Sequence, residues 1–176
     1  MRVYALTEGM QKSFLLSLPP QYRLIWRIGA HTGLRVSDIV TLDKSVLKQK
    51  YKTIRAIKTG KPIRVSLPKE LKTDLKIWCN RSYAARNSKY IFYSERSKSG
   101  HIERVAVFKN FKKAANNIGL PMNIGTHSMR HTFAVKTYKK YKGNLYEVQK
   151  RLQHNNLNDT LLYLIDERGK LPNVKN

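Results

Sequence analysis

Cysteine, acidic residues and long apolar runs are all scarce in this sequence. Its single cysteine, Cys79, excludes an internal disulfide and a zinc site built from several cysteines. No stretch approaches the roughly 18 apolar residues of a membrane-spanning helix, and the first residues lack the apolar core of a signal peptide. We therefore expect a soluble protein of the cytoplasm with no membrane partner.

The shortage of acidic residues leaves a large positive charge. Only 11 residues are Asp or Glu, whereas 35 are Lys or Arg, so the formal net charge is +24. Such a charge indicates a polyanionic partner, and nucleic acid is the leading one. Charge alone does not separate an enzyme acting on nucleic acid from a ribosomal-type protein that coats it.

The length of 176 residues suits one compact domain. Apolar spacing predicts helices over residues 7–18, 22–30, 35–42, 68–81, 104–118, 128–141, 145–153 and 157–166. Alternating residues at 53–57 and 63–67, joined by a turn containing Gly60, predict a β-hairpin, and residues 90–93 predict a short strand between polar loops at 81–89 and 94–100. The fold class expected is α+β, mostly helical with a small antiparallel sheet.

Histidines and a late tyrosine are the candidates for chemistry. His127 and His131 are four residues apart on a predicted helix, but no carboxylate accompanies them as in a zinc-binding His-Glu-x-x-His motif. We therefore expect no metal and no cofactor. Tyr163 stands nine residues after His154. A tyrosine hydroxyl, with an ordinary pKa of about 10, becomes a useful nucleophile only where cations and proton acceptors converge on its target.

Motifs spread along the chain share one pattern. In order they are Thr32-Gly-Leu-Arg35-Val-Ser-Asp38, Lys58-Thr-Gly, His127-Ser-Met-Arg130-His-Thr-Phe-Ala, Leu152-Gln-His154 and Tyr163. Together they resemble the catalytic domain of the tyrosine recombinases, the phage-integrase family, over roughly residues 5–166. The resemblance implies the mostly helical catalytic-domain fold of that family.

The resemblance also implies a role for each cation. Arg35 and Arg130 match the arginine pair that clamps the scissile phosphate, and guanidinium suits the charge that collects on the phosphate oxygens. Lys58 matches the hairpin lysine that protonates the departing 5′ oxygen, with Lys52 and Lys61 as nearby rivals.

Further roles follow from the same resemblance. His127 and His154 match phosphate-contacting histidines, and His127 is also a candidate for exchanging a proton with the nucleophile. Tyr163 matches the nucleophile. Asp38, three residues after Arg35, is expected either to orient that arginine or to be an ordinary acid near a helix start.

Some features depart from the family pattern. Gln153 stands where the family most often has glycine, so we expect the turn there to differ, and we assign His131 no separate role. The expected domains are a catalytic domain at 1–166 and a tail at 167–176, a candidate for docking on a neighbouring protomer. The N-terminal core-binding domain typical of the family is expected to be absent, either because the sequence is a fragment of a longer integrase or because it is a short recombinase of one domain.

The function expected from the resemblance is site-specific DNA recombination or integration through a 3′-phosphotyrosyl link, without metal or ATP. Double-stranded DNA would be the partner, with a homotetramer on two DNA sites and a monomer or weak oligomer in free solution. The alternatives are a type IB topoisomerase, against which the His-x-x-Arg motif argues, and a DNA-binding regulator without activity, in which a catalytic residue would be lost.

Overall fold

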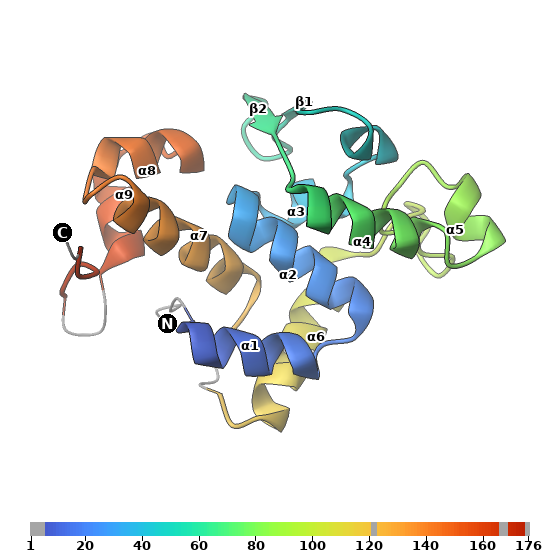
Figure 1. Ribbon diagram of the computed structural model, residues 1–176, viewed down its shortest axis with the longest axis horizontal. Coiled ribbons are helices and arrows are strands. Elements are labelled where there is room, and N and C mark those ends of the chain that lie inside the picture. The colour runs from blue at the N-terminus through green and yellow to red at the C-terminus, as the bar shows by residue number, and fades with distance from the viewer. Residues whose placement is uncertain (1–5, 121–122, 166–168, 175–176) are drawn as a thin grey trace.

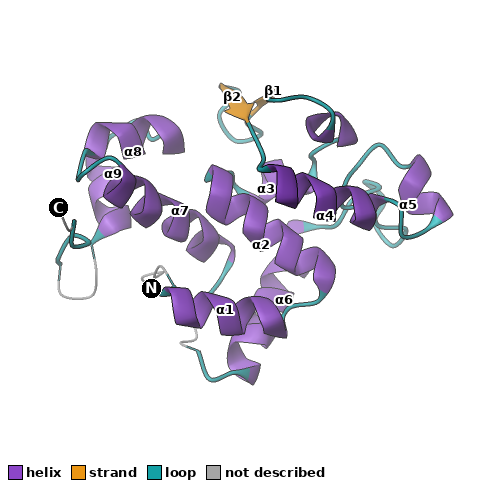
Figure 2. Cartoon of the chain, in the orientation of Figure 1, coloured by secondary structure: helices purple, strands orange, loops and turns teal. Residues whose placement is uncertain are grey.

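The structure is a computed structural model that describes residues 6–120, 123–165 and 169–174. The helices are α1 (Glu8–Ser17), α2 (Pro20–Thr32), α3 (Val36–Val40), α4 (Lys69–Cys79), α5 (Tyr83–Asn87), α6 (Arg104–Asn117), α7 (Thr126–Lys140), α8 (Leu145–Leu152) and α9 (Leu157–Leu164), with a 3-10 helix at Lys44–Leu47. Strands β1 (Lys52–Arg55) and β2 (Pro62–Val65) form an antiparallel hairpin. The predicted fold class is confirmed (Figure 2).

Helix α2 lies at the centre of the fold. Figure 1 shows α1 and α6 on one side of it and α4 with the hairpin on the other, while α7 leads away to α8 and α9. Phe14, Trp26 and Phe111 join α1, α2 and α6 through edge-on ring contacts with centroids 4.8–5.7 Å apart. Burial of these large rings stabilises this half of the fold.

Close packing of α2 against α7 depends on glycine. A Cβ at Gly29 would collide with the side chain of Met129, which is fully buried. The absence of a side chain at Gly29 therefore lets the backbones of α2 and α7 approach each other. This crossing positions the candidate site, because α2 leads into the turn that carries Arg35 and α7 carries His127 and Arg130.

Two predictions about local structure were wrong. Residues 90–93 are not a strand: they form isolated bridges, Tyr90 with Asp43 and Tyr93 with His101, around the buried Ile91 and Phe92. Each side of this segment meets a different partner, so no continuous ladder forms. The segment 81–89, predicted to be a loop, contains α5, whose first turn is capped by Ser82 accepting a hydrogen bond from the Ala85 N–H.

A second, smaller core lies at the far end of α7. Ala134, Tyr138, Val148, Leu152 and Leu164 form it, and Tyr163 and Val174 pack against it. Val174 therefore packs on its own chain's core, while docking of residues 167–176 on a neighbouring protomer stays a prediction. Asp166, the predicted domain boundary, lies outside the described residues. No helix in the described ranges is long and apolar enough to cross a membrane.

Candidate active site

The first motif forms the turn between α2 and α3. Gly33 ends α2 in the left-handed conformation, with φ of 70°, which a residue with a side chain adopts at a cost. A Cβ at this position would also lie 2.5 Å from the ring of Phe133. The Thr32 hydroxyl donates a hydrogen bond to the Ile28 carbonyl and accepts one from the Leu34 N–H. The Thr-Gly-Leu-Arg sequence thus fixes a tight turn that leads directly into Arg35.

Arg130 is held rigidly inside this site. Its guanidinium donates to the carbonyl of Gly33 and to the carbonyl of Leu152, at the end of α8. The residue is only 5% exposed, and burial is the main reason that its pKa falls to about 10. Arg130 therefore stays charged at neutral pH, and two backbone carbonyls fix its orientation before any ligand binds.

Arg35 stands at the N-cap of α3, beside Arg130. Its charge contributes to lowering the pKa values of Arg130, His127 and His154, so its guanidinium lies within electrostatic range of all three. Within the described part of the chain its side chain makes no hydrogen bond or ion pair. The two arginines together form a concentrated positive charge, which suits a phosphate.

Tyr163 points its hydroxyl into this group of cations. Tyr163 Oη lies 2.9 Å from His127 Nδ1, and the Arg130 guanidinium lies near enough to the phenol to lower its pKa. Burial raises the pKa of Tyr163, while the charges of Arg130 and Arg35 oppose that rise. The phenol is therefore protonated at neutral pH and needs a proton acceptor in order to react.

His127 is suited to be that acceptor. Its pKa is lowered by desolvation first, and then by the charges of Arg130, Arg35 and Lys58. The imidazole is therefore mostly neutral at neutral pH and has a lone pair available. The contact with Tyr163 is through Nδ1, so Nδ1 is the ring nitrogen placed to accept the phenol proton.

His154 reaches the site from the turn that follows α8. Its Nδ1 lies 3.1 Å from Thr160 Oγ1, and its ring lies edge-on to the Tyr163 ring with centroids 5.4 Å apart. Its pKa is lowered to about 4, and burial is the largest cause. Gln153, expected to alter this turn, takes the left-handed conformation with φ of 53°. The turn geometry suited to glycine is thus kept, and the Gln153 amide donates to the Pro62 carbonyl of the hairpin.

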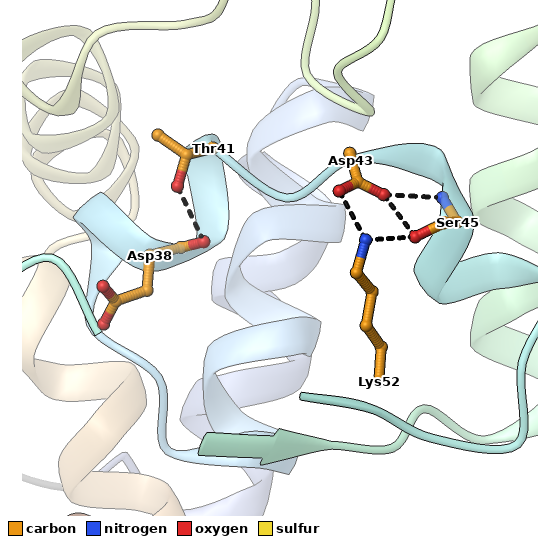
Figure 3. Close-up of polar contacts among 5 residues, drawn as sticks. All are labelled: Asp38, Thr41, Asp43, Ser45 and Lys52. Atoms are coloured by element: carbon orange, nitrogen blue, oxygen red, sulfur yellow. Dashed lines mark hydrogen bonds and ion pairs between the residues drawn. The ribbon is translucent and has the colours of Figure 1, made fainter. Parts of the chain in front are cut away.

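The lysines of the hairpin differ in their partners. Lys52 makes a 2.5 Å ion pair with Asp43 and also donates to Ser45, as Figure 3 shows. Lys61 donates to Asn155 Oδ1 at 2.7 Å. Lys58 is exposed, makes no such bond within the described residues, and contributes to lowering the pKa of His127. Of these lysines, Lys58 is thus the one whose charge acts on His127 and whose ammonium has no partner within the described residues.

Asp38 supports the hairpin rather than Arg35. Its carboxylate Oδ1 accepts a 2.8 Å hydrogen bond from the backbone N–H of Ile57, next to Lys58. Figure 3 shows its carboxylate turned away from the Asp43–Lys52 pair. No Asp38–Arg35 hydrogen bond or ion pair occurs among the residues described, although the negative charge of Asp38 raises the pKa of Arg130.

His131 also lies at the site, although the sequence gave no reason to assign it a role. Its ring stacks on the ring of Tyr163. The four-residue spacing from His127 was the available signal, because it puts both rings on one face of α7. Within the described ranges, no group of three or more His, Cys, Asp or Glu is arranged to hold a metal ion.

The site combines the buried Arg130 and the partly buried Tyr163 and His154 with the exposed His127 and Lys58. A hollow of about 620 Å³ elsewhere, between α2, α4 and α7, is lined by none of Arg35, Lys58, Arg130 or Tyr163. An extended substrate that lies over a surface needs no enclosing cavity. The gathered residues could therefore bind one phosphate of a long polyanion and present a tyrosine to it.

Comparison with known proteins decides the family. The model of the phage integrase family matches residues 5–168, nearly the whole chain. The chain belongs to the phage integrase family. Its relatives include the probable integrase/recombinase YoeC of Bacillus subtilis, 28% identical over 89% of this chain and 84% of that protein. Tyrosine recombinase XerA of Pyrococcus furiosus is also 28% identical, over 90% of this chain and 56% of XerA.

Solved structures confirm the fold of this phage integrase family member. A crystal structure of XerA recombinase aligns over 96% of this chain and 61% of that one, with a TM-score of 0.75 and 20% identity. The XerH site-specific recombinase bound to its difH substrate, in a pre-cleavage complex, aligns over 90% of this chain and 49% of that one, with a TM-score of 0.69 and 23% identity. The chain thus spans about half to three fifths of these recombinases.

Proposed function

We propose that this chain is a site-specific DNA recombinase or integrase that cuts and rejoins DNA strands through Tyr163. The observation that carries the proposal is the 2.9 Å contact of Tyr163 Oη with His127 Nδ1, beside the buried guanidinium of Arg130. This arrangement supports the assignment of Tyr163 as the nucleophile, His127 as its proton acceptor and Arg130 as the cation that holds the phosphate.

The proposed cleavage step balances as follows. Tyr163 Oη forms a bond to phosphorus while the bond from phosphorus to O5′ breaks, which leaves a 3′-phosphotyrosyl ester and a free 5′-hydroxyl. His127 takes the phenol proton, and Lys58 gives a proton to the departing O5′. Arg35 and Arg130 stabilise the charge that collects on the non-bridging oxygens.

Rejoining is the reverse of this step. A 5′-hydroxyl from another strand attacks the phosphotyrosyl ester, and Tyr163 leaves with its proton restored. The ester conserves the energy of the original bond, so the reaction needs no ATP. The arginines and Lys58 supply the charge and the acid, so the proposal requires no metal.

Double-stranded DNA is the proposed partner. The net charge of +24 supports it, as does the DNA-bound state of the XerH structure. We further propose that the chain acts as a homotetramer on two DNA sites and is a monomer or weak oligomer in free solution. Because Tyr163 contacts His127 of its own chain, each protomer is proposed to cut with its own tyrosine.

Trapping of the covalent link tests the proposal. The substrate is a duplex from the DNA that flanks the gene, nicked so that the 5′ product diffuses away and religation fails. We expect a denaturant-resistant protein–DNA adduct with the wild type and with Tyr146→Phe, a matched control at a tyrosine that is 70% exposed. Tyr163→Phe should give none, and an adduct that survives this substitution would overturn the proposal.

A further inference from the structure

His131 packs against one face of the proposed nucleophile. The rings of His131 and Tyr163 are stacked, with centroids 4.3 Å apart and planes 21° from parallel. The other two histidines meet Tyr163 edge-on, His154 at 75° and His127 at 68°. His131 is therefore the histidine of the site that contacts Tyr163 face to face.

His131 is placed for packing rather than for proton transfer. It is 7% exposed, and its Nδ1 is buried with no hydrogen-bond partner among the residues the structure describes. Burial, aided by the nearby His127, lowers its pKa to about 4, so the ring is neutral at neutral pH. A neutral buried ring offers a flat apolar face and adds no charge to the phenol it supports.

Tyr163 needs such a support because of its position in the chain. It is the residue before the last of α9, a helix of eight residues, and helix ends fray unless tertiary contacts hold them. Rotation about Cβ–Cγ leaves Oη in place, because the hydroxyl lies on that axis. Rotation about Cα–Cβ would carry Oη away from His127, and a ring stacked on one face of the phenol blocks that movement.

We propose that His131 is a positioning residue for strand cleavage: its ring holds the Tyr163 ring so that Oη meets the scissile phosphate. In this role it neither touches the phosphate nor exchanges a proton. The inference rests on the proposed function, since it assumes that Tyr163 is the nucleophile.

The shape of the side chain at position 131 is the variable to test. His131→Phe keeps a flat ring, whereas His131→Leu and His131→Gln remove it. In single-turnover trapping on the nicked duplex, we expect the rate of adduct formation by His131→Phe to stay within a few-fold of wild type. Leu and Gln should be slower by roughly 10-fold to 100-fold, the loss typical of a nucleophile displaced by about 1 Å. Binding of uncleaved DNA should be the same in all variants.

A small nucleophile separates positioning from loss of the site as a whole. Hydrogen peroxide can attack the bound phosphate in place of the phenol in a Tyr163→Phe protein. We expect peroxide-dependent cleavage to be equal with and without His131→Leu, and to be abolished by Arg130→Ala. This readout requires a folded site, so it also shows whether the His131→Leu substitution left the fold intact; if it did not, His131→Gln takes its place.

The outcomes separate this inference from the proposed function. If His131→Leu and His131→Gln form the adduct as fast as wild type, or if His131→Phe is as slow as both, the positioning role is wrong while Tyr163 remains the nucleophile. If His131→Phe changes the shape of the pH–rate profile, His131 takes part in proton transfer and the inference also fails. An adduct that persists in Tyr163→Phe instead overturns the proposed function itself.

Discussion

Asp38 offers a sharp test of how the fold delivers Lys58 to the site. Its buried carboxylate accepts the N–H of Ile57, one residue before Lys58. Asp38→Ala removes a hydrogen bond to a charged acceptor, which is worth about 1.5–3 kcal/mol. For a chain of this length each kcal/mol lowers the melting temperature by about 2–4 °C, so we expect a fall of about 3–12 °C.

Asp38→Asn separates the hydrogen bond from the charge. Asparagine keeps an acceptor oxygen in nearly the same place, so it should lower stability by about 1 kcal/mol, less than alanine does. Asp74→Ala is the matched control, because Asp74 forms a partly exposed ion pair with Arg27 that is worth at most about 1 kcal/mol. In thermal unfolding, the fall in melting temperature should therefore be largest for Asp38→Ala, smaller for Asp38→Asn and smallest for Asp74→Ala.

The same variants report on catalysis. If Asp38 acts through Lys58, Asp38→Ala should slow cleavage of an ordinary phosphodiester by roughly 10-fold to 100-fold, part of the 10²–10⁴ typical of general acid catalysis. A substrate with sulfur in place of the bridging O5′ releases a thiolate that needs no proton. On that substrate the variant should cut at nearly the wild-type rate. Equal slowing on the oxygen and sulfur substrates would refute the link between Asp38 and Lys58.

Three further predictions follow from the site. Replacing Gln153 by alanine or by glycine removes the hydrogen bond to the hairpin in both cases, but only glycine relieves the strain of the positive φ. In urea unfolding, Gln153→Ala should therefore be less stable than Gln153→Gly by about 1 kcal/mol. Equal stability of the two variants would show that position 153 is not strained. The folded pKa values of His131 and His154 lie near 4, below the unfolded value, so the unfolded state binds more protons and the free energy of unfolding should fall as pH drops from about 6.5 towards 4. His131 contributes at most about 1.4 kcal/mol per pH unit to the slope of the free energy of unfolding against pH. His131→Phe should therefore reduce that slope, and an unchanged slope would contradict the prediction. If each protomer cuts with its own tyrosine, a mixture of Tyr163→Phe and Arg35→Ala proteins should stay inactive, whereas recovered cleavage would show that the tyrosine acts on a neighbour's site.

The sequence predicted the helices well where apolar spacing was long and regular. Helix α7, predicted over residues 128–141 and observed at Thr126–Lys140, shows how near such boundaries can be. The segment at residues 90–93 was misjudged because its apolar residues serve burial, not strand pairing. The backbone N–H of Ile91 donates to the Leu42 carbonyl, and that of Ile102 donates to the Phe92 carbonyl. The sequence pattern does not reveal such backbone partners.

Motif order identified residues that the fold brings together from the start of α3, the hairpin, α7, the turn after α8, and α9. It did not reveal how each is held. The Arg130 guanidinium is fixed by carbonyls at positions 33 and 152, both far along the chain, and a backbone acceptor leaves no trace in side-chain pattern. The stacking of His131 on Tyr163 was missed for the same reason, since it depends on where α9 meets α7.

The proposed reaction depends above all on Tyr163 being the nucleophile that becomes joined to a 3′ phosphate. The most direct measurement is mass spectrometry of the trapped adduct after digestion with protease and nuclease. We expect one modified peptide, with Tyr163 carrying a nucleotide through its 3′-phosphate, and a free 5′-hydroxyl on the released strand. A nucleotide on another tyrosine, or one attached through its 5′-phosphate, would contradict it.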